Sequence, residues 1–126
     1  MLVSMSWVVT FDDDFFTEAA ALPLEVQIEL AALTRLLEQF GPSLKRPHCD
    51  TLKASRHVNM KELRFSAADG VWRVAFAFDP ERAALLLVAG DKSGVGEKRF
   101  YKTLIAKADG RFDAHLARLA KQKGSR

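Results

Sequence analysis

Charged side chains alternate with apolar ones along two predicted strands in the second half of the chain. Side chains two residues apart share one face of a strand, so Glu62 and Arg64 lie together, opposite Leu63. On the next strand Arg73 and Trp72 point to opposite faces, and we therefore expect Trp72 in the core. A guanidinium group binds phosphate through paired N–H donors, and a carboxylate can accept a proton from a hydroxyl group. This face could therefore bind a polyanion and act on it, or Glu62 could simply neutralise the arginines.

Three strands have to hold these groups in one sheet. Alternation and the β-branched and aromatic content predict strands over residues 60–65, 71–78 and 83–89. Turn residues at 68–70 and 79–82 separate them. The third strand is apolar on both faces, which predicts that a helix covers at least one side of it.

The first part of the chain is predicted to be scaffold. A short strand over residues 6–11 precedes the aspartate run 12–14, which can cap a helix that ends near Ala21. A second helix is predicted over Leu24–Phe40, and Gly41 before a proline ends it. Its apolar residues fall on one helical face: Val26, Leu30, Leu33, Leu37 and Phe40.

Two loops carry further polar groups. Residues 43–50 form a predicted irregular basic loop in which His48 precedes Cys49. Neither a second cysteine nor a paired histidine stands at ligand spacing, so we expect no metal and no cofactor. Residues 90–96 form a glycine-containing loop that carries Lys92, without the residue order of a phosphate-binding loop.

The C-terminal part is predicted to be helical. Asp109 is a candidate N-cap, and Phe112, Leu116 and Leu119 give the helix that follows a narrow apolar stripe. Residues 120–126 are expected to form a frayed basic tail.

The composition is typical of one globular domain. The 126 residues are 48% hydrophobic and 28% charged, and we predict a single domain over residues 1–126. Cys49 has no partner for an internal disulfide, which favours a reducing compartment. The sequence shows neither a secretory pattern nor an apolar run near the roughly 20 residues that span a bilayer. We therefore expect a cytoplasmic protein.

Charge is divided unevenly along the chain. Residues 1–44 contain one basic residue and seven acidic ones, whereas residues 45–126 contain eighteen basic and nine acidic ones. This asymmetry favours a polyanion-binding surface on the second part of the chain. The alternative is an ordinary solvated surface without a partner.

An ordered set of short motifs extends the argument from about residue 6 to residue 119. The set consists of Gly41-Pro42 with Leu44, Arg46-Pro47, residues 52–56, residues 59–64, Trp72-Arg73-Val74, residues 77–80, Gly90-Asp91-Lys92, Tyr101, Ala108-Asp109 and His115-Leu116. In this order they resemble toxins of the RelE/ParE superfamily, specifically the HigB-like branch of type II toxin–antitoxin modules. The resemblance implies an α+β fold, with an antiparallel sheet, two N-terminal helices packed on one face and a C-terminal helix.

The resemblance also implies an activity and partners. Members of this branch are metal-independent mRNA endonucleases that act on ribosome-bound mRNA by 2′-hydroxyl attack, and a small helix-turn-helix antitoxin neutralises them. The alternatives are an RNA- or ribosome-binding module without catalysis and, less favoured, a gyrase-inhibiting toxin. His115 is expected at the surface or in contact with the antitoxin.

The implied site combines catalytic residues with an RNA-binding rim. Arg73 matches the family's phosphate-binding arginine, Lys92 a basic catalytic position, and Tyr101 an aromatic that stacks on or deprotonates nucleotides. Glu62 is the candidate base and Arg64 its neighbour, although ribosome-dependent relatives carry a lysine pair on this strand. The expected RNA-binding residues are Lys53, Arg56, His57 and Lys61.

Overall fold

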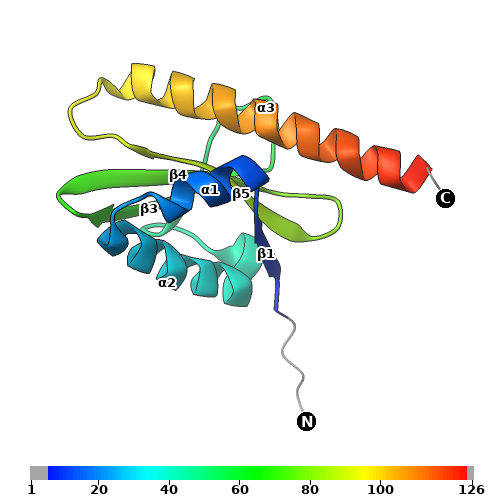
Figure 1. Ribbon diagram of the computed structural model, residues 1–126, viewed down its shortest axis with the longest axis horizontal. Helices are drawn as coiled ribbons and strands as arrows, with labels where there is room; N and C mark the ends of the chain where they lie inside the picture. The colour runs from blue at the N-terminus through cyan, green and yellow to red at the C-terminus, as the bar shows by residue number, and fades with distance from the viewer. Residues whose placement is uncertain (1–5, 125–126) are drawn as a thin grey trace, which may run out of the picture.

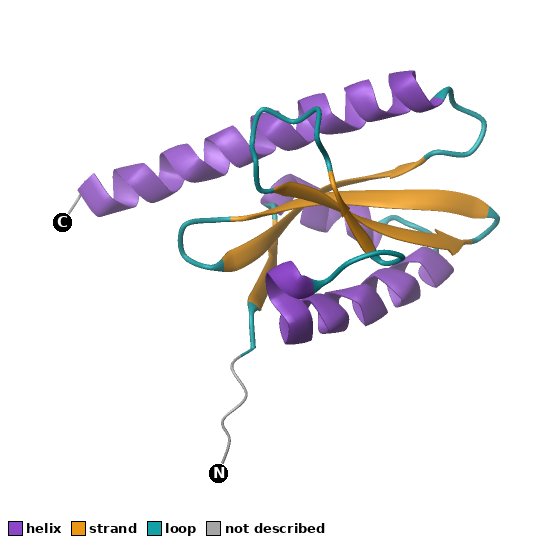
Figure 2. Ribbon diagram, turned by 180° about the vertical axis from the view of Figure 1, so that it is seen from behind, coloured by secondary structure: helices purple, strands orange, loops and turns teal. Residues whose placement is uncertain are grey.

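The computed structural model describes residues 6–124. It consists of a five-stranded sheet with helices on both faces (Figures 1 and 2). The strands lie in the order β1-β5-β4-β3-β2. β1 runs parallel to β5 and the other neighbours are antiparallel, so the predicted α+β class is confirmed with one parallel edge. The elements are β1 (Val8–Phe11), α1 (Asp13–Ala20), α2 (Leu24–Phe40), the 3₁₀ turn η1 (Gly41–Ser43), β2 (Cys49–Thr51), β3 (Met60–Ala67), β4 (Gly70–Phe78), β5 (Ala83–Asp91) and α3 (Glu97–Gly124).

The two N-terminal helices pack on one face of the sheet, as expected. Asp12 caps α1 by accepting a hydrogen bond from the Phe15 amide at 3.1 Å. The predicted bounds of α2 are confirmed, but Phe40 is 45% exposed rather than in the core. At the helix end Gly41 has φ +52°, and a Cβ there would overlap the Trp7 ring. Trp7 thus takes the space beneath the last turn.

The β3–β4 hairpin sets the register of the charged residues. Ala68 and Asp69 form its tight turn with φ of 50° and 58°, the backbone of a two-residue turn that matches strand twist. Arg64 then lies directly opposite Arg73. Trp72 is half-buried rather than in the core as predicted, and its Nε1 donates to the Ala67 carbonyl at 3.2 Å.

The second face of the sheet, on which the sequence predicts polyanion-binding side chains, is covered by α3. α3 is one helix from Glu97, and Asp109, the predicted N-cap, lies buried in its middle. A hydrophobic cluster joins α3 to β4 and β5, and it includes Ala75, Ala77, Leu85, Leu87, Phe100, Leu104, Ile105, Ala108 and Phe112. The small Ala75 and Ala77 leave room for the helix to pack closely on the sheet. α3 also continues through Gly124, so residues 120–124 are helical rather than frayed, and 125–126 lie outside the described residues.

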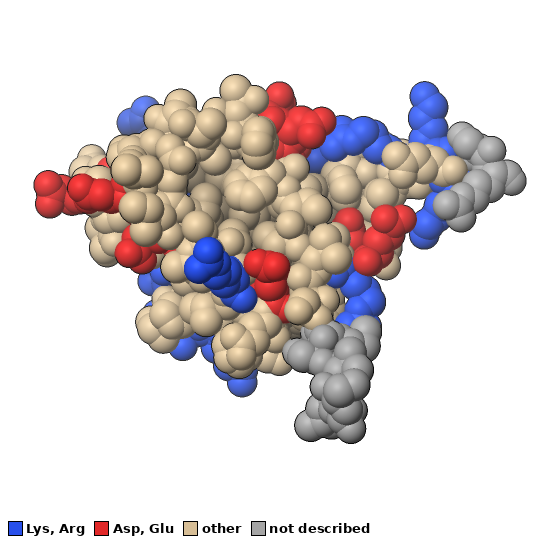
Figure 3. All heavy atoms as spheres, turned by 60° about the horizontal axis from the view of Figure 1, so that its bottom comes forward, with Lys and Arg blue, Asp and Glu red and all other residues tan. Residues whose placement is uncertain are grey.

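The α2 side of the molecule presents mainly uncharged atoms with scattered charged side chains (Figure 3). Within residues 6–124, none of the helices combines the length and the hydropathy that crossing a bilayer requires.

Arg111 joins α3 to α1 and to β5, and we predict that it stabilises the fold. Its guanidinium donates to both Glu18 oxygens at 2.9 and 2.5 Å and to the Leu87 carbonyl at 2.7 Å. Replacing Arg111 by Met should lower the free energy of unfolding by about 1–2 kcal/mol, a value reduced because the Glu18 side chain is 43% exposed. Urea denaturation at pH 7 measures this change, with Arg118→Met on the exposed side of α3 as control.

The pH dependence gives a second readout of the same contact. The hydrogen bond from Arg111 lowers the pKa of Glu18 below its ordinary value. The contribution is therefore present at neutral pH and is lost as the pH falls below the ordinary carboxyl range. Equal free energies of unfolding for the Arg111 and Arg118 variants would contradict the prediction.

Candidate active site

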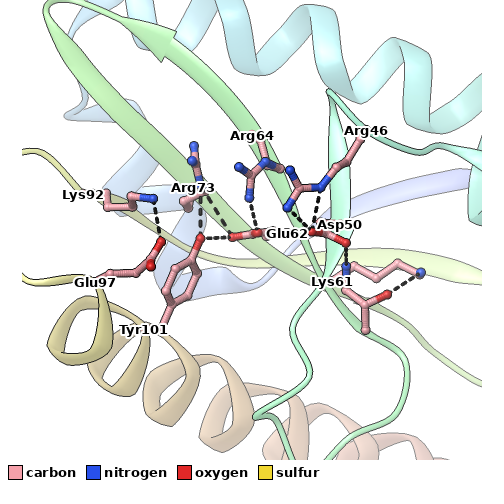
Figure 4. Close-up of polar contacts among 10 residues, drawn as sticks. Arg46, Asp50, Lys61, Glu62, Arg64, Arg73, Lys92, Glu97 and Tyr101 are labelled. Carbon is pink, nitrogen blue, oxygen red and sulfur yellow. Dashed lines mark hydrogen bonds and ion pairs between the residues drawn. The ribbon is translucent and has the colours of Figure 1, made fainter.

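The five side chains expected to be catalytic come together beside the N-terminal end of α3 (Figure 4). Glu62 and Arg64 come from β3 and Arg73 from β4. Lys92 follows the end of β5, and Tyr101 lies in the second turn of α3. Strand alternation brings the first three together, and the long α3 brings Tyr101 onto them from the other layer.

Glu62 is the centre of the hydrogen-bond network. The Tyr101 hydroxyl donates to Glu62 Oε1 at 2.8 Å, and Arg64 Nη1 donates to Oε2 at 2.7 Å. Arg73 Nε donates to the Tyr101 oxygen at 3.2 Å and lies 3.7 Å from Glu62 Oε1. Glu62 is 3% exposed and Arg73 6% exposed, so this carboxylate and this guanidinium meet in a largely water-excluded place.

Charge balance explains why these groups are stable together. Arg64 and Arg73 are directly opposed across two strands, an arrangement that repels when the charges are alike. Glu62, two residues from Arg64, supplies the compensating negative charge. The cluster retains net positive charge, which suits it to a phosphate group.

Tyr101 remains a neutral phenol in this setting. Burial, followed by the hydrogen bond to Glu62, raises the pKa of Tyr101 above its ordinary value. Its hydroxyl is therefore a proton donor at neutral pH, which argues against the predicted role of removing a proton from a nucleotide.

Lys92 completes the site from the loop after β5. Its Nζ lies 5.9 Å from the centre of the Tyr101 ring and 3.0 Å from Glu97 Oε1. The hydrogen bond from Lys92 lowers the pKa of Glu97. Glu97 is 72% exposed and thus holds the lysine from the solvent side. Sequence reasoning missed Glu97, because the expected helix began twelve residues later.

Arg46 and Asp50 were also missed, although Arg46-Pro47 belongs to the motif set. Arg46 donates to Asp50 Oδ2 through Nε at 3.0 Å and Nη2 at 2.8 Å. Asp50 pairs with Glu62 across β2 and β3, in a short strand that replaces part of the predicted irregular loop. A groove of about 440 Å³ results, and we call it the central groove; it is lined by Arg46, Asp50, Thr51, Leu52, Lys53, Ala54, Glu62, Arg64, Glu97, Tyr101 and Ile105.

The residues expected to form an RNA-binding rim do not stay together. Lys53 lines the central groove. Arg56 and His57 instead pair with Asp113 of α3, so they hold a loop against the helix. Lys61 alternates with Glu62, and it lies on the other face with its Nζ 3.5 Å from the Thr51 hydroxyl.

The remaining histidines and the cysteine lie outside the network around Glu62. Burial raises the pKa of Cys49 to about 11, so its thiol is neutral in the core. His48 is exposed and lines a second hollow of about 480 Å³ beside α2. Arg64 and Arg73 also line this hollow. His115 Nε2 lies 2.8 Å from Asp79 Oδ2, at the turn between β4 and β5. Within residues 6–124, His, Cys, Asp and Glu side chains nowhere gather in a group of three that could hold a metal ion.

Comparison with known proteins identifies the family. Residues 17–113 match the family described as Phage derived protein Gp49-like. The chain is 43% identical over 97 residues to the putative toxin HigB3 of Mycobacterium tuberculosis, a match covering 77% of this chain and 82% of that protein. The chain belongs to the Gp49-like family. The predicted resemblance to HigB-like toxins is thereby confirmed.

Two further comparisons concern a longer relative of this Gp49-like chain and a solved structure with the same fold. It is 44% identical over 96 residues to the putative toxin HigB2 of Mycobacterium tuberculosis, and the match spans 75% of this chain but only 47% of that relative. A free-state mutant of the E. coli toxin RelE has the same fold, with a TM-score of 0.60 at 13% identity. That match covers 82% of this chain and 97% of RelE.

Proposed function

We propose that this Gp49-like chain is the toxin of a toxin–antitoxin module and cuts ribosome-bound mRNA as a metal-independent endoribonuclease. One observation carries the proposal: a carboxylate, two guanidinium groups, a phenol and an ammonium group from four parts of the fold converge beside one groove. Cleavage by the 2′-hydroxyl needs a base, cations for the charged phosphorane and an acid for the leaving oxygen.

Each group has a role in this reaction. Glu62 accepts the 2′-hydroxyl proton, and the 2′ oxygen attacks the adjacent phosphorus. Arg64 and Arg73 stabilise the negative phosphorane as the bond to the 5′ oxygen breaks. The neutral Tyr101 donates its proton to that 5′ oxygen, and its hydrogen bond to Glu62 lets the accepted proton return to the phenolate. The products are a 2′,3′-cyclic phosphate and a 5′-hydroxyl end.

The surroundings of the cluster suit a chain passing through it. The central groove and the hollow beside His48 meet at Arg64, which leaves space on both sides of the cluster. Lys53 and Arg46 add positive charge along the central groove, where they can contact backbone phosphates. Action on translating ribosomes places the protein in the cytoplasm, and a small helix-turn-helix antitoxin is the proposed neutralising partner.

A binding role without catalysis is the second candidate, and one observation favours it. Both carboxylate oxygens of Glu62 already accept hydrogen bonds, from Tyr101 and Arg64. Because Glu62 is only 3% exposed, little of this carboxylate is left open to a substrate hydroxyl group. A site fixed in the observed arrangement would bind phosphate through its arginines and leave the RNA intact.

Expression and cleavage assays separate these candidates. We expect induction of the chain without an antitoxin to arrest growth, and purified protein to cut mRNA on programmed ribosomes in the presence of EDTA. Mass spectrometry of the fragments should find 2′,3′-cyclic phosphate ends. Tight, salt-dependent binding with intact RNA would instead support the binding role. Supercoiling defects with intact mRNA would indicate gyrase inhibition.

A further inference from the structure

A further hollow, separate from the one beside His48, adjoins the central groove along α3. It measures about 450 Å³, and we call it the outer hollow; it is lined by Ala54, Lys98, Tyr101, Lys102, Ile105 and Ala106. Three of these residues also line the central groove: Ala54, Tyr101 and Ile105. The Tyr101 ring therefore borders both spaces, while its hydroxyl contacts Glu62. A molecule held at Glu62 can extend past this ring into the outer hollow without leaving the protein surface.

The wall opposite α3 is held in place by a buried carboxylate. Asp109, 4% exposed, accepts a hydrogen bond from the Ser55 hydroxyl at 2.5 Å and from the Arg56 amide at 3.3 Å. His57 Nε2 lies 2.7 Å from Asp113 Oδ1 one turn further along the helix. These contacts place Ala54, next to Ser55, across from Tyr101 and Ile105. The outer hollow is thus a formed feature of the fold.

The outer hollow has two kinds of lining residue, apolar ones that suit the base of a nucleotide and lysines that suit its phosphate. Ala54, Ile105, Ala106 and the Tyr101 ring provide an apolar, partly aromatic surface, on which a base can stack. Lys98 and Lys102 lie at exposed positions beside it, where their ammonium groups can meet a phosphate. An apolar protein side chain would use the first surface but would gain nothing from the two lysines.

We propose that the outer hollow binds the base of a nucleotide that flanks the cleaved bond, with its phosphate on Lys98 and Lys102. The inference rests on the proposed function, because the scissile phosphate has to lie at Arg64 and Arg73. The lining side chains present neither amides nor carboxylates to the base. Recognition is therefore by stacking and shape, and it tolerates different bases.

An abasic scan tests this assignment separately from catalysis. The probe is a ribosome programmed with fluorescent mRNA in which the nucleotide at the cut carries no 2′-hydroxyl, so that binding is measured without cleavage. Each flanking nucleotide is replaced in turn by an abasic sugar. For one flanking position, wild-type protein should lose about ten-fold in affinity, whichever base is removed.

Paired variants show where that base lies. Ala54→Leu with Ala106→Leu fills the outer hollow from both walls, and Ala114→Leu with Ala117→Leu adds the same side chains at exposed positions of α3. The filled variant should show less than a two-fold abasic effect, whereas the control variant should keep the full ten-fold effect.

The outcomes distinguish failure of the inference from failure of the proposed function. Equal abasic effects in the filled and control variants, or no abasic effect in wild-type protein, overturn the inference. Cleavage of unmodified mRNA by the same proteins still tests the proposed function. Wild-type protein that neither binds these ribosomes nor cuts their mRNA contradicts both.

Discussion

Replacing Arg73 by Ala should reduce the rate of mRNA cleavage on programmed ribosomes by at least about 100-fold and should abolish growth arrest. Arg73 is 6% exposed and donates to the Tyr101 oxygen, so its charge acts in a place where solvent screens it little. Loss of this guanidinium removes one of the two charges that would stabilise the phosphorane. It also removes the donor that orients the Tyr101 hydroxyl, the proposed acid. Single-turnover cleavage under saturating enzyme measures the chemical step.

Folding has to be separated from chemistry in this experiment, because a buried arginine also has a structural role. Thermal unfolding of each variant provides the first check, and Arg118→Ala on the exposed side of α3 provides the matched control. Arg73→Lys keeps the charge while losing the planar donor set, and it should recover part of the rate. A folded Arg73→Ala protein that cleaves within about three-fold of wild type would exclude Arg73 from the reaction.

The two sources of the site prediction had different strengths. Alternation along β3 and β4 predicted that Glu62, Arg64 and Arg73 share a face, and the register shows that they do. Lys92 and Tyr101 came from the family resemblance, since neither strand period nor composition relates the loop after β5 to β3. The structure brings all five together, while their catalytic roles stay predictions.

The sequence alone could not show which part of the chain packs against each face of the sheet. The period of β4 shows that Ala75 faces away from Val74, but whether solvent or a helix covers it depends on residues far along the chain. Asp109 was interpreted as the N-cap of a helix because aspartate is a preferred residue at that position. Its real partners, Ser55 and Arg56, are more than fifty residues away. Short-range patterns carry no information about such contacts.

Replacing Glu62 by Gln should lower the cleavage rate by about 100-fold or more, because an amide cannot accept the 2′-hydroxyl proton. The amide keeps the shape of the side chain and an oxygen that can accept from Tyr101 or Arg64. Binding to ribosomes whose mRNA carries no 2′-hydroxyl at the cut should remain equal or become tighter, since the two arginines lose their compensating charge. Cleavage and binding should therefore change in opposite directions or independently.

This separation decides between the two roles of Glu62. If the Glu62 carboxylate only neutralises Arg64 and Arg73, its removal should lower the stability of the protein. Two guanidinium groups would then face each other across the hairpin without a compensating charge. In that case the melting temperature falls while the folded Glu62→Gln protein cleaves at nearly the wild-type rate. Glu38→Gln at an exposed position of α2 is the matched control, since it makes the same change away from the central groove. A loss of cleavage specific to Glu62, with binding retained, identifies the carboxylate at the centre of the network as the base.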